Sequence, residues 1–293
     1  MSVKNDFDRM KVSSVIIKIL LLSIIALITY LLVGVILKNI PTSLISFLFT
    51  ITLHFIILFI LIRSFNKYHI SINNLLGSLS IRKEHWLKLI SIKFLILIFG
   101  ALSVTVIFTL LALVNSGFLT FILTDIDLSS TESNFLYSLL FYVLSFTLAP
   151  VMEELLFRGY LFNKWGAKHG VVKAMIFSSL LFSFVHFDSG FMAHFFSGIF
   201  YCLVYMKTRK LIVPILLHAF HNIVAGAVIF LPTDNTAYEG DLLIESIKKM
   251  EFVFYLGTAL FILLIPIVSY ILYRYYRSVS LLTPYQQNKE FTL

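Results

Sequence analysis

Long apolar runs dominate the chain, and its polar residues gather in the short segments between them. A helix that crosses a membrane needs about 20 apolar residues, so each long run is a candidate span. The runs cover residues 14–37, 42–62, 87–114, 135–160, 171–187, 190–206, 211–231 and 251–273. The pattern predicts an all-α, polytopic membrane protein built as a bundle of about eight transmembrane helices.

Composition and charge exclude two other classes of protein. Of the 293 residues, 59% are hydrophobic and only 13% are charged, which is too little polar surface for a soluble domain. The net charge of +8 does not indicate nucleic-acid binding, because Lys and Arg lie in short clusters between the apolar runs. If the amino terminus is cytoplasmic, the outer segments hold only Lys38, Lys248 and Lys249. We therefore expect an integral protein of a bacterial plasma membrane, in contact with membrane lipid, with both termini cytoplasmic.

The order of the runs predicts three regions. Residues 1–134 should form a three-span region with an interfacial segment at about 64–86, and residues 135–231 should form the functional core. Residues 232–293 should form the last span and a polar cytoplasmic tail, which we expect to be mobile from about Ser278. Lys93 lies about one turn inside its run, so its amino group should reach the inner interface along its own stem.

Glu153, Glu154 and Arg158 interrupt the fourth apolar run. An ionisable side chain at membrane depth costs roughly 2.5 kcal/mol or more, so such a group indicates a functional site. On a helix, Glu154 and Arg158 are neighbours at i,i+4 and can form an ion pair. Glu153 is turned about 100° away from them and should project into the bundle.

Further polar side chains follow in the next apolar runs. His186 ends the fifth run, and His218 and Asn222 share one helical face in the seventh. A carboxylate with an imidazole can activate water, and a second imidazole with a carboxamide can stabilise an oxyanion. Alternatively, Glu153, His186 and His218 could bind zinc and leave an open position for water. The residues leave both mechanisms open, so the cofactor is either zinc or none.

Three motifs in these runs resemble those of one family. Glu153 to Arg158 reads EExxxR, Phe182 to His186 reads FxxxH and His218 to Asn222 reads HxxxN. Together they resemble the CPBP family, which comprises CAAX proteases and bacteriocin-processing enzymes and is also called Abi. The resemblance covers about residues 135–231. The HExxH, GxSG and GxGD motifs of other intramembrane proteases are absent from the sequence.

The resemblance implies an intramembrane endopeptidase similar to the type II CAAX prenyl endopeptidase. It implies that Glu153 activates water together with His186, and that His218 and Asn222 stabilise the oxyanion. The Glu154–Arg158 pair would then support the site. The implied substrate is a membrane-associated peptide or a lipidated protein, and the roles implied for bacterial members are peptide or bacteriocin maturation, self-immunity and the processing of signalling peptides.

A second class of function fits the same motifs. The chain could be a non-catalytic binding or regulatory membrane protein, such as a bacteriocin immunity factor or a modulator of a sensor kinase. The interpretation as an enzyme also requires that Glu153 and His186 lie close together. Straight spans would place them about 20 Å apart. The fourth helix must therefore continue past Arg158 to about Trp165, and residues 188–190 must bend at membrane depth. His194 and His221 should be supporting groups at most.

Overall fold

The computed structural model describes residues 6–77, 83–114, 135–186, 190–227 and 240–290. All regular secondary structure in these ranges is helical. In chain order the elements are η1 (Asp6–Arg9), α1 (Val12–Ile36), α2 (Thr42–Lys67), α3 (Ile72–Leu76), α4 (Lys83–Val114), α6 (Phe135–Phe146), α7 (Leu148–Glu154), η2 (Leu155–Phe162), α8 (Asn163–His169), α9 (Val171–Val185), α10 (Phe191–Thr208), α11 (Ile212–Ala227), α12 (Gly240–Tyr276) and α13 (Pro284–Glu290).

The chain is a polytopic membrane protein. Five helical stretches in the described residues are long and apolar enough to cross a membrane: Val12–Ile36, Thr42–Lys67, His85–Leu110, Phe135–His169 and Phe252–Tyr276. The other three expected spans correspond to α9, α10 and α11, and of these α9 and α11 are apolar helices too short to count among the five. The all-α class is confirmed, while the number of eight spans stays a prediction.

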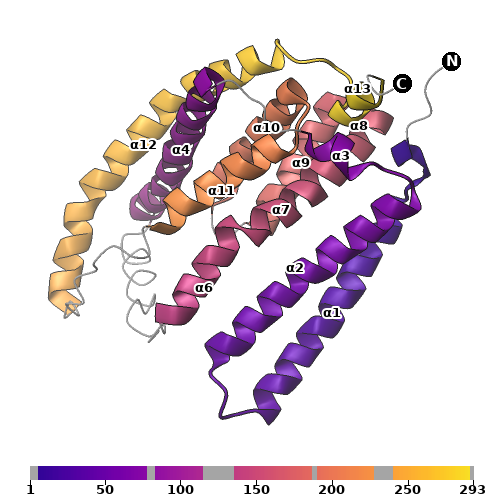
Figure 1. Cartoon of the computed structure of the whole chain (residues 1–293). Helices are drawn as coiled ribbons and strands as arrows, with labels where there is room; N and C mark the ends of the chain where they lie inside the picture. The colour runs from indigo at the N-terminus through magenta and orange to yellow at the C-terminus, as the bar shows by residue number, and fades with distance from the viewer. Residues whose placement is uncertain (1–5, 78–82, 115–134, 187–189, 228–239, 291–293) are drawn as a thin grey trace.

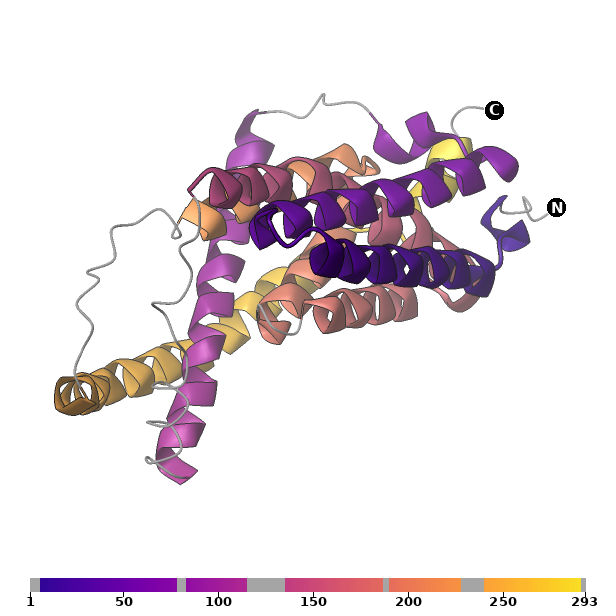
Figure 2. The same ribbon diagram turned by 90° about the horizontal axis from the view of Figure 1, so that it is seen from below.

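The helices that carry the three motifs lie in the middle of the molecule. Figure 1 shows the hairpin α1–α2 on one flank and the pair α4 and α12 on the other. Helices α6 to α11 lie between these flanks, and α10 packs against both α4 and α9. Seen from below, α4 and α12 diverge from the central helices toward one end (Figure 2). The helices outside the motif region therefore enclose the centre of the bundle.

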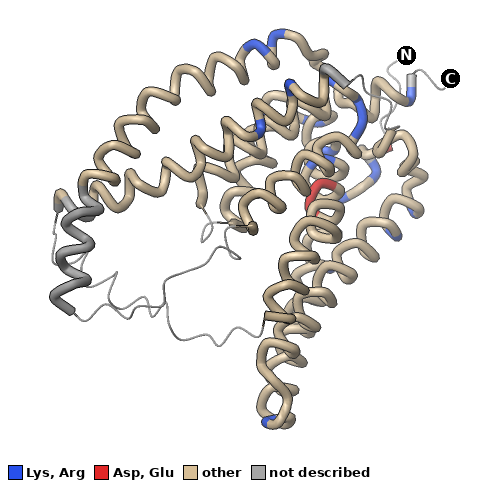
Figure 3. The backbone as a smooth tube through the Cα atoms, turned by 60° about the vertical axis from the view of Figure 1, so that its left-hand side comes forward, with Lys and Arg blue, Asp and Glu red and all other residues tan. Residues whose placement is uncertain are grey.

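The outer faces of the flanking helices are apolar. Ile25 on α1, Phe59 on α2 and Leu263 on α12 are each more than half exposed. Such surfaces suit lipid, because water around so much apolar area would be unfavourable. The basic residues gather toward the end of the bundle where both chain termini lie, as Figure 3 shows. This distribution agrees with the expected cytoplasmic position of that end, which stays a prediction.

The fourth expected span is one long helical stretch with two irregularities. Between α6 and α7 the regular helix is interrupted at Thr147, three residues before Pro150. Pro150 has no amide proton to donate to the carbonyl four residues earlier, which favours a break there. Beyond α7, the segment η2 is a π-helix, whose turns are wider than those of an α-helix. The stretch then continues through α8 to His169, as the catalytic hypothesis required.

Asn163, the residue that follows the π-helix, forms hydrogen bonds with backbone carbonyl groups of that helix. Its side-chain amide donates to the carbonyl oxygens of Arg158 and Gly159, each at 3.0 Å. Its Oδ1 atom accepts a hydrogen bond from the backbone amide of Tyr285 at 3.3 Å. Asn163 is fully buried, so these contacts supply hydrogen bonds that water cannot.

The structure corrects the prediction of a mobile tail. Helix α13 follows Ser278, and its Tyr285 is 2% exposed, with its ring 5.1 Å from that of Phe7. Lys289 forms a salt bridge with Asp6 at 2.8 Å. The tail thus folds against the amino-terminal segment through a buried aromatic contact and a salt bridge.

The expected interfacial segment is only partly one element. Residues 64–67 complete α2, and α3 contains five residues, capped by the Ser71 hydroxyl, which accepts from the amide of Asn74 at 3.3 Å. Trp86 belongs to the first turn of α4. The bend expected at residues 188–190 lies mostly outside the described residues, which resume at Gly190.

Candidate active site

The structure brings Glu153, His186 and His218 together from three separate elements. Glu153 lies near the end of α7, His186 directly follows α9, and His218 lies in the middle of α11. The Glu153 Oε2 atom is 3.6 Å from Nε2 of His186 and 3.7 Å from Nε2 of His218. One carboxylate oxygen thus faces two imidazole nitrogens. The fourth helix continues past Arg158, as this approach requires, whereas most of the bend expected at residues 188–190 lies outside the described residues.

The two neighbouring acids, Glu153 and Glu154, differ in their exposure. The side chains of Glu153 and His186 are 14% and 24% exposed, whereas those of Glu154 and Arg158 are 0% exposed. The Arg158 Nη1 atom lies 2.9 Å from Glu154 Oε1, which forms the i,i+4 pair expected from the spacing. The side chains of Glu153 and His186 therefore reach the protein surface in part, although Glu153 Oε2 is buried, while the Glu154–Arg158 pair is sealed within the protein.

Hydrogen bonds at Nδ1 orient both imidazoles. Nδ1 of His186 is 2.9 Å from the carbonyl oxygen of Phe182, and Nδ1 of His218 is 2.9 Å from Glu154 Oε1. A carbonyl oxygen only accepts, so the Nδ1 atom of His186 carries the proton. In its neutral form His186 then presents an Nε2 lone pair toward Glu153. The carboxylate of Glu154 orients His218 in the same way as the acid of a catalytic triad orients its histidine.

Aromatic rings surround the buried guanidinium of Arg158. Its central carbon lies 4.5 Å from the ring centre of Phe182 and 5.1 Å from that of Tyr201. Tyr201 also stacks on His218, with ring centres 5.2 Å apart and planes inclined by 22°. The rings stabilise the guanidinium where water is excluded and fix the position of His218. The Phe of the FxxxH motif thus contacts the ion pair as well as His186.

Lys93 corrects one sequence prediction and adds a residue to the site. Its side chain is fully buried, and its Nζ atom donates to the hydroxyl of Ser197 at 2.6 Å. Nζ also lies 4.6 Å from the ring centre of Tyr201, and the group interacts electrostatically with Glu154. Lys93 therefore points into the bundle instead of along its stem to the interface, because polar partners on α10 replace water there.

Asn222 is placed differently from the other motif residues. Its side-chain amide donates to the backbone carbonyl of Ser145 on α6 at 2.6 Å. Within the described residues it has no hydrogen bond to Glu153, His186 or His218. One amide proton is thus used to join α11 to α6, and the second is left for other partners.

The two histidines expected at the periphery differ. His194 stacks on His186 with ring centres 4.5 Å apart, and its Nδ1 atom is 2.9 Å from the carbonyl oxygen of Gly190. His221 lies 6.3 Å from His194 between ring centres, and its buried Nδ1 has no hydrogen bond to any described residue. His194 therefore supports the ring of His186, whereas His221 belongs to an outer layer.

Sequence reasoning missed Lys93, Ser197 and Tyr201 as parts of the site. One signal was present, because a lysine within a span already indicates a functional role. The serine and the tyrosine are spaced four residues apart on α10 and so share a helical face. Nothing in the sequence showed that this face would meet α4.

The donor set was tested for a metal. Both histidines have the second-shell contact that zinc ligands usually have, a carbonyl or a carboxylate at the other ring nitrogen. However, no group of three His, Cys, Asp or Glu side chains among the described residues is arranged to hold a metal ion.

Comparison with known protein families gives a match over the motif region. A model of the family described as "Type II CAAX prenyl endopeptidase Rce1-like" matches residues 135–224. No curated protein and no solved structure matches the chain. The matched residues contain all three motifs and every side chain of the candidate active site except Lys93.

Proposed function

Because residues 135–224 are a domain of the Rce1-like type II CAAX prenyl endopeptidase family, a family of proteases, we propose that the chain is an intramembrane endopeptidase. The observation that carries the proposal is the approach of two imidazole Nε2 atoms to one carboxylate oxygen, Glu153 Oε2, which is buried although its side chain is 14% exposed. The bond cleaved is a peptide bond in a membrane-associated peptide or a lipidated protein. We propose residues 135–231 as the catalytic core, with α4 contributing Lys93 from outside it.

In the proposed reaction Glu153 and His186 bind one water molecule. Glu153 accepts the proton of that water as its oxygen attacks the peptide carbonyl, and the proton then passes to the leaving amine. His186 holds the water through Nε2, since Nδ1 is bonded to the carbonyl of Phe182. Both groups are on the exposed side of the site, which agrees with their contact with a substrate.

Two residues are proposed to stabilise the oxyanion. His218 donates from Nε2, and its Nδ1 atom is hydrogen-bonded to Glu154. Asn222 donates its second amide proton, since the first is bonded to Ser145. Glu154 and Arg158 position His218 and do not contact the substrate.

The test is cleavage by the purified protein reconstituted in lipid. A prenylated peptide and its unprenylated counterpart are incubated with the wild type and with Glu153→Gln, His186→Ala and His218→Ala, and products are measured by mass spectrometry. We expect each variant to reduce kcat by about 10²–10⁴-fold, the usual contribution of a general acid or base. Cleavage by Glu153→Gln at the wild-type rate would refute the assignment.

His54→Ala is the matched control. His54 lies in α2, and its Nδ1 atom is 2.8 Å from the carbonyl of Thr50, the same contact that His186 makes four residues back. Its removal should leave the cleavage rate within about twofold of wild type. Metal analysis and chelator treatment of the same sample test the zinc mechanism, because loss of activity on chelation would require a metal ligand set at Glu153, His186 and His218.

A further inference from the structure

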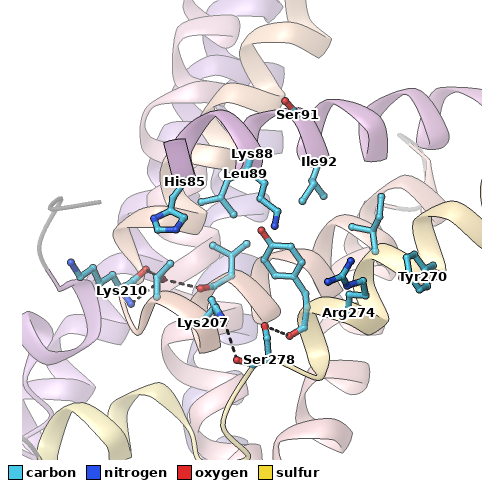
Figure 4. Close-up of a pocket in the computed structure, with 14 residues that line it drawn as sticks. His85, Lys88, Leu89, Ser91, Ile92, Lys207, Lys210, Tyr270, Arg274 and Ser278 are labelled. Atoms are coloured by element: carbon cyan, nitrogen blue, oxygen red, sulfur yellow. Dashed lines mark hydrogen bonds between the residues drawn. The ribbon is translucent and has the colours of Figure 1, made fainter. Parts of the chain in front are cut away.

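A second polar site lies away from the candidate active site. A cavity of about 880 Å³ opens between α4, α10 and α12, near their ends in the basic half of the molecule. Its size is within the range of about 300–1,000 Å³ that is usual for small-ligand sites. Four basic side chains line it (Figure 4): Lys88 from α4, Lys207 from α10, Lys210 from the turn after α10 and Arg274 from α12.

Among the side chains that the structure describes, none that lines this cavity is acidic. Among the described residues, Lys88, Lys207 and Arg274 form no salt bridge with a carboxylate. Lys207 donates instead to the carbonyl of Ser278 at 3.1 Å, and Lys88 and Arg274 lie near tyrosine rings, at 5.7 Å from Tyr275 and 5.9 Å from Tyr270. Like charges gathered around one cavity repel each other, so an anion bound among them would be stabilised.

The walls of the cavity and its neighbourhood are apolar. Leu89, Ile92 and Val204 form part of its lining. One turn further along their helices, Phe94 on α4 and Ile267 on α12 are 46% and 48% exposed. These side chains continue from the basic cavity along the outer faces of two membrane helices. The occupant that suits such a surface has an anionic head and an apolar tail.

We propose that this cavity binds the phosphate headgroup of an anionic phospholipid, whose acyl chains lie along α4 and α12. Basic pockets between transmembrane helices are a recurring form of lipid recognition. Tyr270 is 60% and Tyr273 55% exposed at the same end of α12, and exposed tyrosines are typical of the membrane interface. The cavity therefore lies at the depth in the membrane at which phospholipid headgroups lie.

The test is lipid retention by the purified full-length protein in a neutral detergent, measured by native mass spectrometry. Phosphatidylglycerol is compared with phosphatidylcholine, whose headgroup has no net charge. Wild type should retain at least fivefold more phosphatidylglycerol, and Lys207→Gln/Arg274→Gln should lower that retention to the level of phosphatidylcholine. Equal retention of the two lipids by wild type would overturn the proposal, as would full retention of phosphatidylglycerol by the double variant.

Two further variants separate charge at this cavity from charge in general. Lys207→Arg/Arg274→Lys keeps both charges and should bind as wild type, which also shows that the positions tolerate substitution. Arg63→Gln/Lys67→Gln also removes two positive charges, but from exposed positions at the end of α2, and should leave lipid retention unchanged. A loss of phosphatidylglycerol equal to that of the cavity variant would overturn the proposed site.

An excess of inorganic phosphate tests the source of the anion. Phosphatidylglycerol should stay bound, since the lipid also contacts apolar walls, and its displacement would identify free phosphate as the occupant and overturn the lipid assignment. The measurement is of binding, so its result does not depend on the proposed proteolysis.

Discussion

Four ionisable side chains from two regions of the chain meet inside the bundle. Glu153, Glu154 and Arg158 come from one helical stretch, and Lys93 comes from α4. Their formal charges sum to zero, which reduces the cost of burial because a buried charge is tolerated when it is paired. The EExxxR motif by itself has two negative charges and one positive charge. Lys93 supplies the second positive charge.

The contact of Lys93 with Ser197 gives a prediction at the scale of single residues. Lys93→Met keeps the length of the side chain but leaves the buried hydroxyl of Ser197 without its donor, so we expect the free energy of unfolding to fall by about 1–3 kcal/mol. The measurement is denaturant unfolding in detergent, followed by tryptophan fluorescence. Ser197→Ala should cost less when added to Lys93→Met than by itself.

Additive losses in that double variant would contradict the contact. A control outside the proposed sites is Lys67→Met at the end of α2, because the side chain of Lys67 is exposed. Its substitution should change the free energy of unfolding by no more than about 0.5 kcal/mol.

Part of this site could be predicted from the sequence, whereas the rest depends on how the helices pack. The pairing of Glu154 with Arg158 follows from i,i+4 spacing and needs no tertiary information. The approach of His186 to Glu153 required a helix that continues past its apparent end, and only the motif order suggested it. The partners of Lys93 depend on how α4 packs against α10, which no local pattern specifies.

Helices α9 and α10 approach closely at Gly198. A Cβ atom added there would lie 2.8 Å from Cβ of Ser179 and 3.1 Å from Nη2 of Arg158. Both neighbours are fully buried, so neither can move into free space. The glycine therefore allows the two helices to enclose the guanidinium between them.

Gly198→Ala gives a prediction at the scale of elements. The added methyl group should overpack the contact between α9 and α10, lower the free energy of unfolding by about 1–3 kcal/mol and reduce peptide cleavage by displacing Arg158. Gly34→Ala in α1 is the control, because its Cβ would meet nothing within 4 Å. The prediction fails if both variants unfold at the same denaturant concentration.

At the scale of elements, apolar runs located the helices well but not their lengths. Helix α12 begins at Gly240 and extends to Tyr276, although its apolar run covers only 251–273. In contrast, α9 and α11 are shorter than a usual span. A hydropathy pattern reports contact with lipid, whereas these short helices are partly surrounded by protein, which the pattern does not distinguish.

The two ends of the chain pack against each other and against α8 at one side of the molecule. Tyr285 is almost completely buried, and its hydroxyl donates to Asp6 at 3.1 Å. Lys164 of α8 donates to the carbonyl of Phe7 at 2.7 Å. The amino-terminal segment, α8 and α13 therefore form one packed cluster beside the π-helix. No local pattern could predict this cluster, since its residues are separated by up to 283 positions.

This cluster allows packing and charge to be compared in one experiment. Tyr285→Ala removes a large buried ring and leaves a cavity, so the free energy of unfolding should fall by about 3 kcal/mol. Lys289→Ala removes the salt bridge with Asp6, whose side chains are 30% and 23% exposed, and should cost less than about 1 kcal/mol. Hydrogen exchange should increase in α13 and α8 for Tyr285→Ala, because Asn163 loses a firmly placed partner at the backbone of residue 285. Equal losses for both variants would mean that the ends are held by charge, and unchanged exchange in α8 would mean that the tail does not support the helix behind the site.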